Sequence, residues 1–96
     1  MKTMYVYILK CSDDTFYTGV TNNLERRIIE HNSGISEESY TKSRRPLQLV
    51  FYVAFNDPNT AIAYEKKIKK WSKSKKQALI DSKFESLPEL SKKNFK

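Results

Sequence analysis

The chain has very few of the residues that form disulfides or metal centres. It contains a single cysteine, Cys11, and a single histidine, His31, among 96 residues. One cysteine cannot build an internal disulfide framework, and these two side chains cannot supply the four ligands of a structural zinc site. No apolar stretch approaches the ~20 residues that span a bilayer, and no cleavage site follows the apolar N-terminal segment, which ends at Lys10. We therefore expect a cytoplasmic protein without membrane contact.

Acidic residues are outnumbered by basic ones. Eighteen Lys and Arg against 11 Asp and Glu give a net charge of +7 on a chain long enough for one domain. Eight lysines lie between Lys66 and Lys83, where Asp81 is the single acidic residue. Such clusters favour sequence-tolerant contacts with nucleic-acid phosphates, although a solvated face that aids solubility is the alternative. The expected nucleic-acid contacts are Lys42, Arg44, Arg45, Lys66, Lys69, Lys70 and Lys73.

Hydrophobic patterning predicts a small α/β (α+β) protein with the order β-β-α-β-α-α. Strands are expected at 4–10 and 16–20, which form a hairpin, and at 47–55, whose near-continuous apolarity predicts a central strand buried on both faces. Helices are expected at 24–32, at 58 to about 70, and from about 72 to 80, with caps at Asn22 or Asn23, Gly34 and Asp57–Pro58. Residues 35–46 read as a loop. We expect a domain at 1–82 and a loosely docked or flexible tail at 83–96.

Charged side chains share the apolar stripes of the first two predicted helices. Arg27 and His31 follow Leu24 at intervals of three and four, and Glu65 lies between Ala61 and Ile68. Such side chains are rarely buried unless paired. One interpretation is an Arg27–Glu65 ion pair at the edge of the core, with His31 hydrogen-bonded nearby. The other is a polar pocket with a cation, a carboxylate and an imidazole.

The tyrosines of the predicted hairpin extend this pattern. Tyr5-Val6-Tyr7 is followed by Tyr17-Thr18-Gly19, and a glycine inside a strand marks a bulge or a close approach of another group. With Arg27, His31 and Glu65 downstream, these residues resemble the paired signature of the GIY-YIG nuclease superfamily over residues 3 to 80. The stretches 17–34, 65–71 and 75–80 are more similar still to its small stand-alone bacterial branch, the YazA/YhbQ-like proteins.

The resemblance implies a three-stranded antiparallel sheet flanked by helices and metal-dependent cleavage of a phosphodiester. It implies that Tyr17 or Tyr7 acts as general base or orients the attacking water, for which nearby positive charge must favour a phenolate. Arg27 would contact the scissile phosphate, and Glu65 would hold one divalent cation, Mg²⁺ or else Mn²⁺. His31 would position a hydroxyl or relay a proton. Three further residues are expected to line the pocket: Thr21, Asn32 and Tyr40.

Two departures from the family pattern accompany the match. The first triplet is Tyr-Val-Tyr, without the glycine of Gly-Ile-Tyr, and the hairpin turn has Asp14 where close relatives often have glycine. A two-residue turn at Asp13-Asp14 would place Tyr7 and Tyr17 on opposite faces of the hairpin. A shared pocket therefore predicts an odd-length loop or a bulge between them.

The leading hypothesis is an endonuclease-type domain that hydrolyses DNA, in repair or recombination, with a monomer assumed. Characterised nucleases of the family usually carry an additional DNA-targeting domain, and we expect none in a chain of this length. The alternatives are a nucleic-acid-binding module whose pocket cleaves little or nothing, and an interaction domain whose tail, from Leu87 to Phe95, docks a partner.

Overall fold

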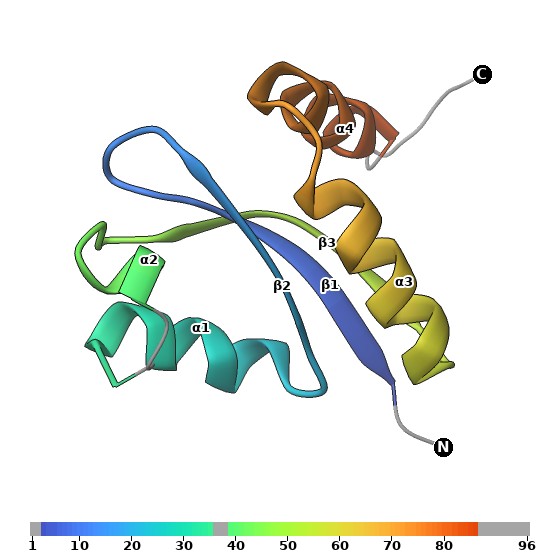
Figure 1. The fold of residues 1–96 in the computed structure, drawn as a ribbon, viewed down its shortest axis with the longest axis horizontal. Coiled ribbons are helices and arrows are strands. Elements are labelled where there is room, and N and C mark those ends of the chain that lie inside the picture. Colours follow the sequence, from blue (N-terminus) through green and yellow to red (C-terminus); the bar gives the residue numbers. More distant parts are fainter. Residues whose placement is uncertain (1–2, 36–38, 87–96) are drawn as a thin grey trace.

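The computed structural model describes residues 3–35 and 39–86. Two strands, β1 (Met4–Lys10) and β2 (Phe16–Thr21), form the predicted hairpin, and β3 (Gln48–Phe55) completes an antiparallel sheet in the order β2-β1-β3. The helices are α1 (Leu24–Ser33), α2 (Ser39–Lys42), α3 (Pro58–Lys69) and α4 (Lys73–Ser86). The expected α+β class and antiparallel sheet are thus confirmed (Figure 1).

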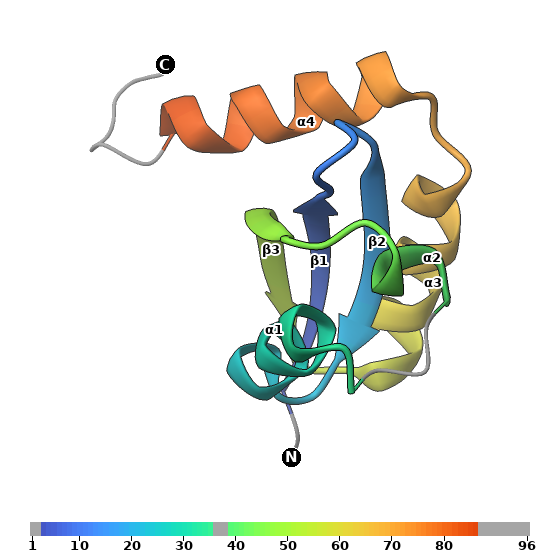
Figure 2. The same ribbon diagram turned by 90° about the vertical axis from the view of Figure 1, so that its left-hand side faces the viewer.

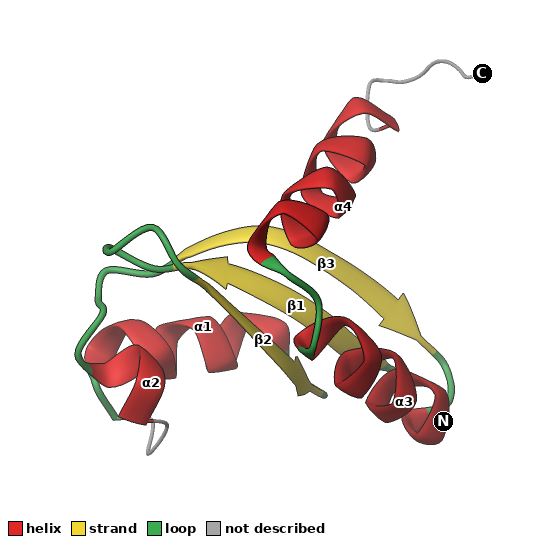
Figure 3. Cartoon of the chain, turned by 45° about the horizontal axis from the view of Figure 1, so that its top comes forward, coloured by secondary structure: helices red, strands yellow, loops and turns green. Residues whose placement is uncertain are grey.

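The sheet separates two apolar layers. Val6 and Ile8 of β1 pack with Phe51 against α3, whereas Tyr7 and Leu9 pack on the opposite face beneath α1. Figures 2 and 3 show α1 and α3 on opposite sides of the sheet, with α4 across the end that carries the β1–β2 loop. None of the four β1 side chains is more than 1% exposed. The strand buried on both faces is therefore β1.

The prediction that 47–55 forms the central strand is wrong, because β3 lies at an edge of the sheet. Its apolar residues have two different environments. Phe51, Val53 and Phe55 belong to the core on the α3 side, whereas Tyr52 on the other face is 49% exposed. A register shift opposite Ile8 and Leu9 adds one residue to β3 at Val50. An edge strand with an aromatic outer face thus resembles a central strand in sequence.

Local chemistry begins and ends the long helices as expected. The Asn23 side chain accepts a hydrogen bond from the Arg26 amide, and Gly34 ends α1 with φ +81°. Asp57 accepts from the Thr60 amide ahead of Pro58 in the first turn of α3. The last helix reaches Ser86, further than expected. The boundary at residue 82 stays a prediction, and residues 87–96 of the predicted tail lie outside the described part of the chain.

The segment predicted as a loop contains the one-turn helix α2, which sequence patterning missed. Four residues are too few for a helix to be stable alone, so α2 depends on tertiary contacts. The Tyr40 ring stacks on Tyr17 with centroids 6.1 Å apart, and Thr41 hydrogen-bonds to His31. Within residues 3–35 and 39–86, no helix is both long and apolar enough to span a membrane.

Candidate active site

The β1–β2 register brings the two signature tyrosines to one face of the sheet. Tyr7 lies opposite Gly19, and Leu9 lies opposite Tyr17. The connecting loop, residues 11–15, has an odd length between the paired residues Lys10 and Phe16. Side chains two apart on a strand share a face, so Tyr7 and Tyr17 meet with ring centroids 6.4 Å apart. The predicted irregularity is therefore confirmed as an odd-length loop.

Asp14 makes that loop possible. It has φ +69°, a conformation unusual for a residue other than glycine. Its carboxylate binds Lys10 at 3.2 Å and Lys73 of α4 at 2.9 Å. The two lysines, first through the Lys73 hydrogen bond, hold the pKa of this carboxyl below its usual value. The charge pairs anchor the turn although a glycine is absent.

Gly19 leaves space for the Tyr7 hydroxyl. A Cβ at this position would overlap the hydroxyl oxygen of Tyr7 and would lie 2.6 Å from its Cζ and 3.1 Å from Cε2 of Tyr17. No side chain fits there without displacing a tyrosine. Gly19 thus marks the close approach of the Tyr7 hydroxyl, which is one of the two explanations that the sequence offered for a glycine inside a strand.

A buried hydrogen-bonded chain runs from Tyr7 through His31 to Thr41. The Tyr7 hydroxyl lies 3.1 Å from Nε2 of His31, and Nδ1 of His31 lies 2.9 Å from Oγ1 of Thr41. His31 and Thr41 are completely buried. In a neutral imidazole one nitrogen donates and the other accepts, so the two partners orient the ring and select its tautomer. Sequence patterning missed Thr41 because it lies on the unpredicted helix α2.

Arg27 faces these tyrosines from α1. Burial lowers the pKa of its guanidinium, but hydrogen bonds with Tyr7 and Glu30 outweigh burial, so the pKa lies above the usual value. The ion pair with Glu30 measures 3.1 Å, and 28% of the Arg27 side chain is exposed. Arg27 therefore presents a permanent positive charge to the tyrosine pair and remains accessible to a ligand.

Glu65 lies on α3, the helix on the other side of the sheet, and is connected to Tyr17 through Lys69. It is 8% exposed, and its Oε2 lies 3.5 Å from Nζ of Lys69. That Nζ also lies 5.9 Å from the centroid of the Tyr17 ring. Among the described residues, Glu65 forms an ion pair with Lys69. Arg27 and Arg26 both form ion pairs with Glu30. The Arg27–Glu65 ion pair considered from sequence is not formed.

The donor chemistry around Glu65 fits a weakly held divalent cation. Mg²⁺ is commonly bound by one or two carboxylates with water and substrate phosphates, and Glu65 supplies one carboxylate. The Lys69 side chain is 56% exposed and can leave it. In the part of the chain that the structure describes, no three His, Cys, Asp or Glu side chains gather as a metal cluster.

Comparison with known proteins agrees with this geometry. The GIY-YIG catalytic domain matches residues 3–78. This chain belongs to the GIY-YIG catalytic domain family. A UPF0213 protein of Syntrophus aciditrophicus is 49% identical over 80 residues, which cover 83% of this chain and 92% of that protein. One from Clostridium perfringens is 48% identical over 79 residues, 82% of this chain and 84% of that protein.

Two solved structures resemble this GIY-YIG domain. The solution structure of a UPF0213 protein from Bacillus halodurans has a TM-score of 0.56 and 41% identity, covering 84% of this chain and 85% of that one. A protein from E. faecalis has a TM-score of 0.60 and 31% identity, covering 88% of each chain. Fold and sequence thus identify the same family, whereas the names of these relatives state no activity.

The basic residues expected to contact nucleic acid differ in their surroundings. Arg44 donates to Asp13 at 2.9 Å and to the Tyr40 carbonyl at 2.8 Å, and lies 4.0 Å above the Tyr40 ring. Its contacts hold α2 against the β1–β2 loop. Lys69 and Lys73 are paired with carboxylates. Four are exposed with no ion pair to any described residue: Lys42, Arg45, Lys66 and Lys70.

Two further residues expected to line the pocket have local structural contacts instead. The Asn32 side chain donates to the Leu47 carbonyl at 3.1 Å and accepts from the Leu47 amide at 2.7 Å, which ties α1 to the start of β3. Thr21 accepts from the Asn23 amide at 3.1 Å and so shapes the entry to α1. Tyr40, by contrast, does lie against Tyr17.

Lys76 is a buried charge that sequence reasoning missed. It is 7% exposed, and burial, with some contribution from Lys69, lowers the pKa of its ammonium, although the Glu65 carboxylate opposes the change. Its spacing from Leu79 and Ile80 places it on the apolar stripe of α4, which is the signal that could have identified it. Lys76 and Lys69 line a hollow beside Tyr17.

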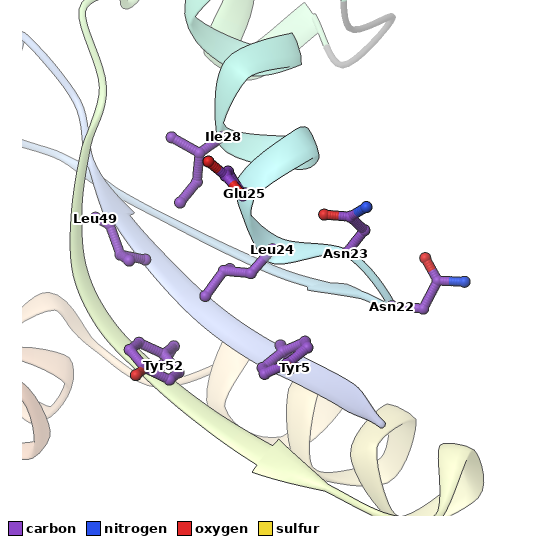
Figure 4. Close-up of a pocket in the computed structure, with 8 residues that line it drawn as sticks. All are labelled: Tyr5, Asn22, Asn23, Leu24, Glu25, Ile28, Leu49 and Tyr52. Carbon is purple, nitrogen blue, oxygen red and sulfur yellow. The ribbon is translucent and has the colours of Figure 1, made fainter. Parts of the chain in front are cut away.

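A larger hollow of about 530 Å³ lies away from the signature tyrosines. Figure 4 shows it between the start of α1 and the outer face of β1 and β3. None of the residues assigned to the site from sequence lines it. Its lining residues are Tyr5, Asn22, Asn23, Leu24, Glu25, Ile28, Leu49 and Tyr52. The volume of a hollow therefore does not by itself identify the candidate active site in this fold.

Proposed function

We propose that this domain is a metal-dependent endonuclease that hydrolyses phosphodiester bonds in DNA. The observation that carries the proposal is the convergence of Tyr7, Tyr17, His31 and Arg27 on one face of the sheet. Glu65 reaches the adjoining edge of β2 through Lys69. Membership of the GIY-YIG catalytic domain family supports an endonuclease-type activity and a nucleic-acid substrate.

Burial assigns different roles to the two tyrosines. Tyr7 is 1% exposed and hydrogen-bonds to His31, whereas Tyr17 is partly exposed at the β2 edge. Only the accessible hydroxyl can meet a water molecule from solvent. We assign Tyr17, as its phenolate, to accept the proton of the attacking water, and Tyr7 and His31 to support the position of Tyr17 and Arg27.

The hydrolytic step then uses the charges around Tyr17. The water oxygen bonds to phosphorus, its proton passes to the Tyr17 oxygen, and the bond from phosphorus to the leaving oxygen breaks. Arg27 stabilises the negative charge that develops on the phosphate oxygens. A divalent cation at Glu65, with Mg²⁺ the first choice and Mn²⁺ the second, would stabilise charge on the leaving oxygen.

A cleavage panel tests this proposal. Duplex, branched and single-stranded DNA, and matching RNA, are incubated with the protein and Mg²⁺ or Mn²⁺. We expect cleavage that stops with EDTA and in the Glu65→Gln and Arg27→Ala variants, while DNA binding by both variants remains. Matched controls are Glu25→Gln and Arg26→Ala, which alter exposed side chains of the same types on α1.

The contrary result is equally clear. A wild-type protein that binds DNA in a salt-dependent way and never cleaves any of these substrates would establish the binding module instead. Absence of both binding and cleavage would favour the interaction domain. We propose a role in repair or recombination, and we therefore expect the fastest cleavage on the branched substrates.

A further inference from the structure

A hollow along the outer edge of β2 adjoins the candidate active site. It has a volume of about 310 Å³ and lies between β2, α2, α3 and α4. A second, smaller hollow of about 190 Å³ shares three of its lining residues and continues it toward Lys73. We call the two together the β2 groove, which is lined by Thr15, Phe16, Tyr17, Thr18, Tyr40, Lys69, Lys73 and Lys76.

The groove contains a buried lysine, Lys76, that forms no ion pair with a described residue. Lys76 is 7% exposed, and no described carboxylate lies within the 4.0 Å of an ion pair. Burial disfavours the charged form of this lysine, and the nearby Glu65 carboxylate only partly opposes that effect. Lys69 and Lys73 also line the groove, each paired with one carboxylate, Glu65 and Asp14 respectively. Three lysines beside two carboxylates leave an excess of positive charge, which favours an anion.

A second, independent feature is the hydroxyl of Thr18. It is buried and has no hydrogen-bond partner in the described structure. A buried polar atom left in this state normally has a missing partner such as a ligand or water. Thr18 lines the same hollow as Lys76, so a donor hydroxyl and an ammonium are available to one bound group.

The remaining walls suit a nucleic-acid strand. The rings of Tyr17 and Tyr40 stack on one another with an interplanar angle of 29°, and Tyr40 lines both parts of the groove. Aromatic faces beside a basic groove are the usual features of single-strand binding. Tyr17 also belongs to the proposed catalytic site, so a strand in the groove continues directly into that site.

We propose that the β2 groove is a second phosphate subsite, in which Lys76 and Thr18 bind a backbone phosphate next to the one that is cleaved. The order of the groups places this phosphate on the α4 side of Tyr17. The inference rests on the proposed function for its choice of ligand, a nucleic-acid strand. Binding by Lys76 and Thr18 does not itself require cleavage.

Binding without metal tests the subsite separately from catalysis. Inorganic phosphate and a short 5′-phosphorylated single-stranded oligonucleotide are each titrated in EDTA while backbone amide signals are followed by NMR. We expect both ligands to shift the amides of Thr18 and Lys76, with the oligonucleotide acting at lower concentration. Oligonucleotide binding that leaves both amides unmoved would overturn the proposal. A response to inorganic phosphate alone would also overturn it, because the site would then not accept a strand.

Variants supply the second arm. Lys76→Met keeps the apolar stem and removes the charge, and we expect oligonucleotide affinity to fall about tenfold or more. Lys67→Met is the matched control, since Lys67 is exposed and lies on the far side of α3 from Glu65. Equal affinities for the two variants would contradict the role of Lys76.

Thr18→Val separates binding from packing. The substitution keeps the shape of the side chain and removes the unpaired hydroxyl, so we expect weaker oligonucleotide binding with no loss of thermal stability. A variant that loses stability and binds normally would show a structural role alone. Failure of the wild type to cleave DNA would refute the proposed function and leave these binding results standing.

Discussion

A substitution of Gly19 tests the geometry of the candidate site directly. A methyl group there would collide with the hydroxyl of Tyr7. We expect Gly19→Ala to lower the free energy of unfolding by about 1–3 kcal/mol, as overpacked substitutions do. Cleavage should fall as well, because Tyr7 or Tyr17 must move. Denaturant unfolding and the cleavage panel measure the two effects.

A double variant provides the control for that prediction. Tyr7→Phe removes the hydroxyl that the new methyl group would meet, so Gly19→Ala should cost less in the Tyr7→Phe background than alone. If the two costs simply add, the clash arises from the ring carbon Cζ, which phenylalanine keeps, and not from the hydroxyl. The residue scale therefore explains why a glycine stands in the middle of β2: it makes room for a hydroxyl.

At the scale of the helices, the N-terminal cap of α1 stabilises the element that carries two of the site residues. The Asn23 side chain caps α1, the helix that carries Arg27 and His31. We expect Asn23→Ala to lower stability by about 1 kcal/mol, as the loss of such a cap usually does. Asn22→Ala is the matched control, because Asn22 is exposed and makes no hydrogen bond to a described residue. Thermal unfolding that affects both variants equally would exclude a capping role.

The cap of α3 makes part of the stability dependent on pH. The Thr60 hydroxyl and amide donate to the Asp57 carboxylate at 2.6 and 2.9 Å and hold its pKa below the usual value. A depressed folded-state pKa stabilises the fold above the unfolded pKa, and this contribution is lost as the pH falls through the folded pKa. We expect the Tm of the wild type to fall more than that of Asp57→Asn between about pH 6 and pH 3. Parallel Tm curves would contradict the prediction.

At the scale of the whole molecule, the basic residues differ in whether they are free to contact nucleic acid. Of the residues expected to contact nucleic acid, Arg44 is held by Asp13 and Tyr40, whereas Lys66 and Lys70 are exposed. We expect DNA binding to weaken steeply with salt, and Lys66→Met/Lys70→Met to reduce the slope of log affinity against log salt by about 1.4–1.8, one phosphate contact for each lysine. Anisotropy titrations at several KCl concentrations measure it. An unchanged slope would remove these lysines from the interface, and Lys67→Met serves as control.

Much of the fold follows from short-range patterns. The hairpin, the long helices and their caps at Asn23, Gly34 and Asp57 were predictable because capping and apolar spacing act within a few residues of sequence. The strand order was not, because the apolar run of β3 reflects a core on one face and an aromatic surface on the other. The helix α2 was also not predictable, because its stability comes from Tyr17 and His31, distant in sequence.

The same division applies to the site. By itself the sequence determined the residue types, their spacing and the family, since the pattern of Tyr7, Tyr17, Arg27, His31 and Glu65 requires no coordinates. Tertiary structure decided which of these groups meet: the odd-length loop puts both tyrosines on one face, Thr41 orients His31, and Lys69 takes the place of Arg27 as the partner of Glu65. Only folding also buries Lys76 beside Tyr17. Helix and strand periodicity act along the chain, whereas register, burial and charge pairing depend on contacts between segments that the sequence separates.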